Sequence, residues 1–194
     1  MTPRPSQRAV IMDAALLCFA RNGYGATRVR DIAEAASMSE GALYRHFASK
    51  EELARELHVQ AMSVFSEELL AASVADMATA SLRQMAARVL TLYREQPAAF
   101  IYALLQAPPA AVAGMPENRD LPIDIIARVI QQARMQGSVR AGDSRVLASC
   151  FLGCLVQPIA LSLTAPDCVR DILADDEQDM TIVEAALGSL GLTS

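Results

Sequence analysis

The sequence contains no tryptophan, and its 194 residues include only two histidines, His46 and His58. Common catalytic and nucleotide-binding patterns are missing as well, because there is no H-E-x-x-H, no P-loop and no G-x-G-x-x-G. Few side chains are therefore available for acid–base or nucleophilic chemistry. The sequence predicts a protein that is not an enzyme.

The four cysteines follow no pattern that is typical of metal binding or of a disulfide framework. Cys18, Cys150, Cys154 and Cys168 include no C-x-x-C pair and no His/Cys ligand spacing. Neither a metal nor another cofactor is predicted. Cys150 and Cys154 are four residues apart and share one face of a predicted helix, where they are interpreted as small packing residues. A redox role for this pair stays open.

The first residues, "MTPRPSQR", are polar and precede no signal-like apolar core, so the expected location is the cytoplasm. One later segment, Val146 to Pro166, has 21 residues without a charge, about the length that spans a bilayer as a helix. It contains Ser149 and Gln157, however, and no aromatic belt or basic cluster flanks it. The interpretation is a helix buried in a core or in a subunit interface, with no membrane partner.

The charge of the chain is unevenly distributed. Apolar residues make up 53% and charged residues 20%, which is typical of a folded protein. Residues 1 to 50 hold seven Lys and Arg against four Asp and Glu, whereas the remaining residues hold ten against eighteen. The net charges of the two parts are thus +3 and −8. This asymmetry favours an anion-binding head on an acidic body.

Apolar residues recur at helical spacing along most of the chain, and no alternating strand pattern occurs. The sequence predicts an all-α fold with a three-helix amino-terminal head and a helical body, divided into domains 1–50 and 51–194. The first predicted helix ends near residue 21. The others cover about 27–36, 40–46, 50–72, 79–96, 97–106, 122–136, the stretch from 143 or 144 onward, and 178–190. "APPAAVAGMPENRDLP" interrupts the pattern with four prolines.

The two short helices at about 27–36 and 40–46 have the dimensions of a helix-turn-helix. Thr27 is expected to cap the first of them, and Ser49 with Glu52 fits a capping box for the long helix that follows. A small core is predicted from the apolar residues Phe19, Ile32, Ala33, Leu43 and Phe47. Gly41, Ala42 and Arg45 then point away from this core, and small residues with one arginine suit entry into a DNA major groove.

Basic residues stand in the first turns of two predicted helices, where the helix dipole favours acidic ones. Arg28 and Arg30 follow Thr27, and Lys50 opens the long helix. Backbone N–H groups at such helix starts attract phosphate, and a basic side chain adds its charge to the same anion. The alternative interpretation is ordinary solvated surface charge.

Residues 11 to 53, "IMDAALLCFARNGYGATRVRDIAEAASMSEGALYRHFASKEEL", resemble the amino-terminal domain of the TetR (tetracycline repressor) family of bacterial transcriptional regulators. The resemblance implies phosphate contacts for Thr27, Arg28, Tyr44 and Lys50, and base-facing contacts for Glu40, Gly41, Ala42, Arg45 and His46. Arg30 is added to the predicted DNA-binding residues because of its place in the first turn of a helix. Three residues depart from the family pattern, namely Ser37 in place of a turn glycine, Met38 in place of a small β-branched residue, and Glu40 in place of a basic or neutral one.

In this family, helices beyond the head form a ligand pocket and a dimer interface. Apolar candidates for the pocket are Met62, Phe65, Met85, Leu92, Tyr93, Phe100, Tyr102 and Ile126, and ordinary core packing is the competing interpretation. Candidates for the dimer interface are Cys150, Gly153, Cys154, Ile182, Ala186 and Leu190. The predicted function is a homodimeric repressor that binds a palindromic DNA operator and is released by a largely apolar small-molecule effector. A helical carrier or sensor of apolar molecules without DNA binding is the alternative.

Overall fold

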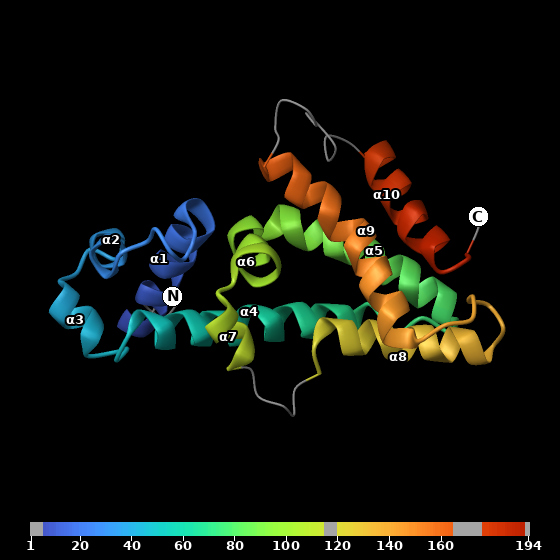
Figure 1. Ribbon diagram of the computed structural model, residues 1–194, viewed down its shortest axis with the longest axis horizontal. Helices are drawn as coiled ribbons and strands as arrows, with labels where there is room; N and C mark the ends of the chain where they lie inside the picture. Colours follow the sequence, from blue (N-terminus) through green and yellow to red (C-terminus); the bar gives the residue numbers. More distant parts are fainter. Residues whose placement is uncertain (1–5, 115–119, 165–175, 193–194) are drawn as a thin grey trace, which may run out of the picture. The chain divides into compact units, whose positions relative to one another are not determined.

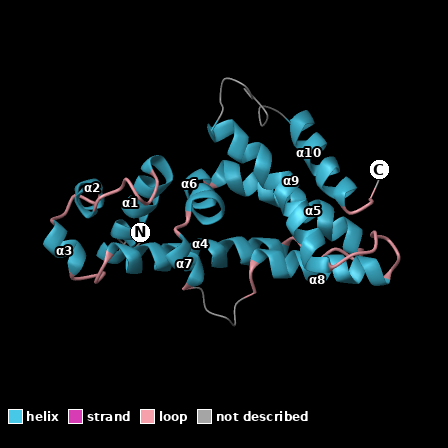
Figure 2. Cartoon of the chain, in the orientation of Figure 1, coloured by secondary structure: helices cyan, strands magenta, loops and turns pink. Residues whose placement is uncertain are grey.

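The computed structural model describes residues 6–114, 120–164 and 176–192, and the described part contains helices and loops without a strand (Figure 2). The helices are α1 (Gln7–Asn22), α2 (Val29–Ala35), α3 (Glu40–Tyr44), α4 (Lys50–Ala71), α5 (Ala78–Glu95), α6 (Pro97–Ile101), the π-helix η1 (Tyr102–Gln106), α7 (Pro109–Ala113), α8 (Pro122–Met135), α9 (Ser144–Thr164) and α10 (Asp176–Ser189). Figure 1 shows them in chain order. The all-α prediction is confirmed.

The helices belong to two compact units that interleave along the chain. The head unit holds Met1–Met62 and Gln96–Arg119, and the body unit holds Ser63–Glu95 and Asp120–Ser194. In the head unit α1 packs against α2, α6 and η1; in the body unit α8 and α10 both pack against α9 and α5. These units are defined by packing, whereas the division at residue 50 was predicted from function. That division stays a prediction.

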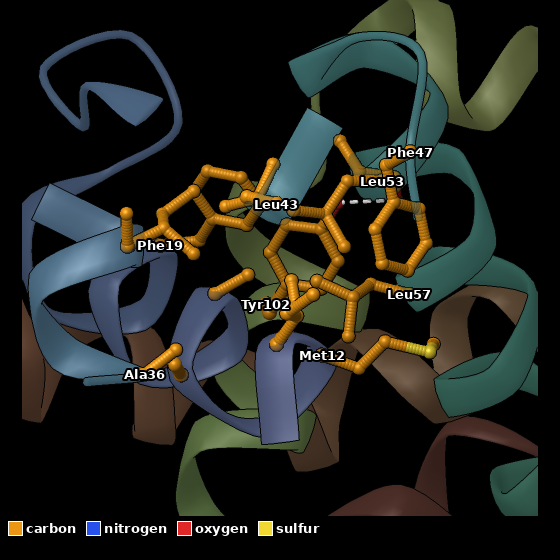
Figure 3. Packing of buried hydrophobic residues seen from close by; sticks show 14 residues of the cluster. Met12, Phe19, Ala36, Leu43, Phe47, Leu53, Leu57 and Tyr102 are labelled. Atoms are coloured by element: carbon orange, nitrogen blue, oxygen red, sulfur yellow. Dashed lines mark hydrogen bonds between the residues drawn. The ribbon is translucent and has the colours of Figure 1, made fainter. Parts of the chain in front are cut away.

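The head unit has its own apolar core, shown in Figure 3. All five predicted core residues, Phe19, Ile32, Ala33, Leu43 and Phe47, are at most 2% exposed. Burial of a large apolar side chain of this kind stabilises a fold by about 1.5–3 kcal/mol. The core also contains Tyr102, whose ring stacks on Phe19 with centroids 5.5 Å apart. The residue pattern therefore predicted these five residues correctly, but the same core also contains residues outside that prediction, among them Leu53, Leu57 and Tyr102.

Several helix ends follow the predicted capping chemistry. The Glu52 N–H donates to Ser49 Oγ at 3.1 Å, and the Glu52 carboxylate accepts from the Ala48 N–H at 2.6 Å. Asp143 Oδ1 accepts from the N–H groups of Arg145 and Val146 at the start of α9. Pro97 occupies the first turn of α6, as predicted.

Two local features differ from the sequence-based expectation. The segment 97–106 is helical throughout, but its second half is the π-helix η1. A short helix, α7, lies within the proline-rich stretch that was predicted to be irregular. Its Pro109 is in the first turn, where a missing N–H costs nothing, so proline there starts a helix rather than breaking one.

Candidate nucleic-acid interface

The outward face of α3 is the part of the head unit that combines exposure with small and charged side chains. Glu40, Gly41, Tyr44 and Arg45 are exposed, and Ala42 is half-buried. Leu43 and Phe47 anchor the opposite side, and the Arg8 guanidinium lies 4.5 Å from the centroid of the Phe47 ring. The predicted orientation of α3 is confirmed.

The amino-terminal end of α3 is capped by a side chain and has room around its first turn. Ser39 Oγ accepts from the Ala42 N–H at 3.2 Å, as expected for an N-cap serine. A Cβ added to Gly41 would meet no heavy atom within 4 Å. Glycine in a helix is less stable than alanine by about 1 kcal/mol, so the fold of the head does not itself require Gly41.

The turn between α2 and α3 is a Schellman motif with a serine at its left-handed position. Ser37 has φ +56°, the one positive φ among the described non-glycine residues. Its N–H donates to Glu34 O at 3.0 Å, and the Met38 N–H donates to Ala33 O at 2.9 Å. The substitution of serine for the family's turn glycine therefore places a non-glycine residue at a positive φ. Met38, the next residue, packs against the core of the head unit.

The predicted N-cap role of Thr27 is wrong. Thr27 is 1% exposed, and its hydroxyl donates to Cys18 O at 3.1 Å and Gly23 O at 2.8 Å. Arg28 is the N-cap instead, and its N–H donates to the Asp31 carboxylate at 2.7 Å. Thr27 thus ties α2 to the end of α1 in the unbound chain.

Arg30 and His46 both have partners at the surface of the head unit. Arg30 is exposed and forms an ion pair with Glu34 at 2.7 Å, which raises the pKa of the Arg30 guanidinium. Exposed pairs at this helical spacing contribute little to stability, so the guanidinium can exchange this partner for another anion. His46 is half-buried, and its Nε2 lies 3.3 Å from Gln7 Oε1.

Lys50 is engaged with the backbone of the loop that precedes α2. Its ammonium donates to Tyr24 O at 3.0 Å and Thr27 O at 2.9 Å, and it lies 4.2 Å from the centroid of the Tyr24 ring. The Tyr24 hydroxyl donates to Glu51 Oε1 at 3.0 Å. Burial, followed by this hydrogen bond, raises the pKa of Tyr24 to about 12 and keeps the phenol neutral. The structure thus gives Lys50 a positioning role that sequence reasoning missed.

The residues predicted to line a ligand pocket are mostly core residues of the unit to which they belong. In the head unit Phe100 and Tyr102 are buried; in the body unit Phe65, Met85, Leu92 and Ile126 are buried. Met62 and Tyr93 are half-buried. Their ligand contacts stay a prediction.

The body unit also has an open polar groove of about 390 Å³ that contains none of these predicted residues. Its lining comes from α8 and the start of α9: Asp124, Ala127, Arg128, Gln131, Arg134, Asp143, Ser144 and Arg145. Arg145 pairs with Asp124 at 3.0 Å. Among the described residues, no group of three or more His, Cys, Asp and Glu side chains could hold a metal ion.

The six residues predicted for a dimer interface divide into two groups. Cys150 and Gly153 are exposed on α9, and Cys154 beside them is half-buried. Ile182 and Ala186 of α10, and Leu190 just after it, are in contrast buried in the body unit, at 8%, 0% and 0% exposure. The exposed residues of α10 include Thr181, Ala185 and Gly188 instead. Cys168 lies outside the described residues.

A known protein family matches the sequence of the head. The family described as "Bacterial regulatory proteins, tetR family" matches residues 11–57, which include α2, α3 and the turn between them. This part of the chain is therefore similar to that family, and the match ends within α4.

The curated relatives match only part of the chain. The HTH-type transcriptional repressor KstR2 of Mycobacterium tuberculosis is 50% identical over 52 residues, which cover 27% of this chain and 26% of that protein. KstR2 of Rhodococcus jostii is 43% identical over 65 residues, 29% of this chain and 32% of that one. The chain therefore spans about a quarter to a third of the length of these relatives.

Solved structures match nearly the whole chain at low identity, which establishes the fold alone. FadR of Bacillus subtilis in complex with stearoyl-CoA has a TM-score of 0.75 at 20% identity, covering 93% of this chain and 98% of that one. AibR in complex with isovaleryl coenzyme A and operator DNA has a TM-score of 0.72 at 22% identity, covering 95% and 98%. The fold that the chain shares with these two proteins therefore includes the helical body.

Proposed function

We propose that the chain is a transcriptional repressor that binds a palindromic operator as a homodimer and is released by a small, largely apolar effector. The observation that carries this proposal is the outward face of α3, where Gly41 and Arg45 are exposed while Leu43 and Phe47 hold the helix to the core. A glycine that the fold does not need permits close approach of a second molecule. Arg45 is exposed and is not part of the core, so its guanidinium is available for a bidentate contact with guanine.

The electrostatics of the head support DNA as the partner. Residues 1 to 50 have a net charge of +3 in a chain whose total is −5. Arg28 and Arg45 are exposed, and Arg30 is held only by a surface ion pair. Positive charge gathered near a groove-sized helix attracts the phosphate backbone, whose contacts position a reading helix before bases are recognised.

The outward face of α9 supports a second copy of the chain as a partner. Its exposed residues Val146, Cys150, Gly153 and Leu161 carry no charge. A Cβ added to Gly153, or to Gly188 on α10, would meet no heavy atom within 4 Å, so neither glycine is required by packing within the chain. Small residues on two neighbouring helices permit close approach in a four-helix interface.

Among the described residues, α9 is the helix that is long and apolar enough to cross a bilayer, and 28% of its most apolar window is buried in the chain. Its opposite face packs against α8 and α10 through side chains such as Phe151 and Leu155. A helix that is built into a compact unit on one side and uncharged on the other fits a subunit interface. A cytoplasmic location belongs to the same proposal.

An acyl-CoA thioester is the effector class that we propose. FadR and AibR, which share this fold, are described in complex with stearoyl-CoA and isovaleryl coenzyme A. The predicted lining residues of both units are aromatic or aliphatic and suit an acyl chain. Only the acyl end of such a ligand is apolar, and its coenzyme A part carries phosphate groups, so we assign the apolar lining residues to the acyl chain alone.

The test is a fluorescence-anisotropy titration of the full chain with labelled DNA from upstream of its own gene, at several salt concentrations. We expect a specific complex that is at least about a thousandfold tighter than that with scrambled DNA, a steep loss of affinity with salt, and release by an acyl-CoA. A chain that binds acyl-CoA but forms no specific DNA complex would instead be a helical carrier of apolar molecules.

A further inference from the structure

We infer that His58 on α4 and Gln106 on η1 form the polar part of an effector site in the head unit, for an uncharged ligand segment that carries a carbonyl and an N–H group. The amides of an acylated pantetheine arm have this chemistry. The inference rests on the proposed effector response and specifies which atoms recognise the ligand.

His58 is a buried polar side chain whose bonding capacity is not used by the described residues. It is 3% exposed, and its Nδ1 has no hydrogen-bond partner in the described part of the chain. Its ring meets the edge of Tyr102 with centroids 6.4 Å apart at 82°. Burial lowers the pKa of His58, so the ring is neutral near pH 7 and offers one N–H donor and one acceptor. A buried nitrogen in this state is stabilised by a ligand that bonds it.

Gln106 provides a complementary atom on the segment that contacts the same helix. Its Oε1 is buried and, within the described residues, without a hydrogen-bond donor. The segment is held to α4 by Tyr102, whose hydroxyl donates to Ala54 O at 2.6 Å. Ala54 and His58 are four residues apart and therefore on one face of α4. The Tyr102 contacts thus bring η1 to the face of α4 that carries His58.

The π-helical geometry of η1 is a further sign of a site at this place. π-Helices are rare, and they occur frequently at functional sites because they widen the backbone and change the direction of side chains. Here the five residues Tyr102–Gln106 are π-helical, with the contact residue Tyr102 at one end and Gln106 at the other. A regular α-helix would place Gln106 at a different angle from Tyr102.

The chemistry of the two atoms limits the ligand. Gln106 Oε1 only accepts hydrogen bonds, so the ligand has to donate an N–H or O–H to it. The neutral His58 ring can donate to a carbonyl oxygen through Nδ1–H. A carboxylate is disfavoured, because these two groups bring no positive charge to compensate for its burial. A secondary amide or a thioester next to an amide satisfies both groups, whereas a free fatty acid does not.

The experiment compares His58→Leu and Gln106→Leu with wild type and with Gln132→Leu, a change at an exposed glutamine of α8 in the body unit. The probes are decanoyl-CoA and decanoate, measured by isothermal titration calorimetry, and Tm is measured without probe. We expect each of the two test variants to keep or raise its Tm, because an unpaired buried polar atom is removed, and to bind decanoyl-CoA about tenfold more weakly. Gln132→Leu should bind like wild type, and His58→Gln, which keeps a donor and an acceptor, should recover part of the loss.

Unchanged decanoyl-CoA binding in both test variants would overturn the inference, as would decanoate binding as tightly as decanoyl-CoA. If His58→Leu does not fold, Gln106→Leu decides alone. Wild type that forms a specific DNA complex but does not bind decanoyl-CoA would overturn this inference and leave the DNA-binding proposal standing. Binding that depends on His58 and Gln106 in a chain without a specific DNA complex would support the site and overturn the repressor.

Discussion

The outward faces of α3 and α9 offer two contrasting uses of a helix surface. Each carries a glycine, Gly41 or Gly153, whose added Cβ would meet nothing within 4 Å of its own chain. Around Gly41 the exposed residues include Glu40 and Arg45, whereas the exposed neighbours of Gly153 are uncharged. Both faces leave room for a partner, but only the first carries a basic side chain, Arg45, that can contact a polyanion. The comparison teaches that charge, rather than space, distinguishes a DNA-reading face from a self-association face.

The largest expected effect is at α9. Gly153→Arg should convert a homodimer into monomers, because burying an unpaired guanidinium in an uncharged interface costs several kcal/mol. Light scattering at low micromolar concentration measures the mass. Gln132→Arg, at an exposed site of α8, is the control and should leave the mass unchanged. A dimeric Gly153→Arg variant would remove α9 from the interface.

The next effect is at the charged face. Arg45→Ala should lose about 1–3 kcal/mol of operator binding and relax the preference at about one position per half-site, if Arg45 contacts a base edge. Anisotropy titrations on operator and scrambled DNA separate the two roles. Equal losses on both DNAs would show that Arg45 contacts a phosphate rather than a base edge.

Lys50→Met tests whether a basic residue at a helix start holds DNA or the protein itself. Because its ammonium already donates to Tyr24 O and Thr27 O, we expect the free energy of unfolding to fall by about 1–3 kcal/mol while the salt dependence of DNA binding stays unchanged. Urea denaturation and salt titration measure the two quantities. Arg28→Met should leave the free energy of unfolding unchanged and lower the salt dependence of DNA binding. A lower salt slope for Lys50→Met, by about one per contact, would restore the phosphate role predicted from the sequence.

Gly41→Ala adds one methyl group to the open first turn of α3. Stability should be kept or rise by up to about 1 kcal/mol, because alanine is the better helix former. Operator affinity should fall by on the order of 1 kcal/mol if DNA approaches this backbone closely. Calorimetric Tm and anisotropy are read on the same preparation. A variant with unchanged DNA affinity would show that the space at Gly41 is not used by DNA.

The smallest effect is at the turn of the helix-turn-helix. Ser37→Gly should stabilise the chain by roughly 0.5–1 kcal/mol. It removes the cost of a left-handed serine, about 1–2 kcal/mol, but glycine loses more backbone entropy on folding, which offsets part of this gain. The reciprocal change, Gly137→Ser, is matched: Gly137 has φ +74° in the Schellman motif after α8 and no neighbour within 4 Å of an added Cβ. It should destabilise by a similar amount in urea denaturation. Two changes of the same sign would contradict this explanation.

Much of the head could be predicted because its information is local. Helical spacing predicted that Leu43 and Phe47 lie on the buried side of α3, and the resemblance, which places a glycine in the turn, predicted a positive φ at Ser37. The capping by Ser49 and Asp143 follows from side chains that bond backbone groups two or three residues away. Interactions over such short distances along the chain are legible in the sequence.

The sequence by itself determined the all-helical class, several of the helix ends, five core residues of the head and the family that the chain resembles. Only the tertiary structure decided that Thr27 and Lys50 bond the chain's own carbonyl groups, that Ile182, Ala186 and Leu190 face inward, and that η1 brings Tyr102 against Ala54. The physical reason is distance along the chain. A side chain with two possible partners takes the one that folding brings within about 3 Å, and when that partner is 23 or 48 residues away, as for Lys50 and Tyr102, no local pattern records it.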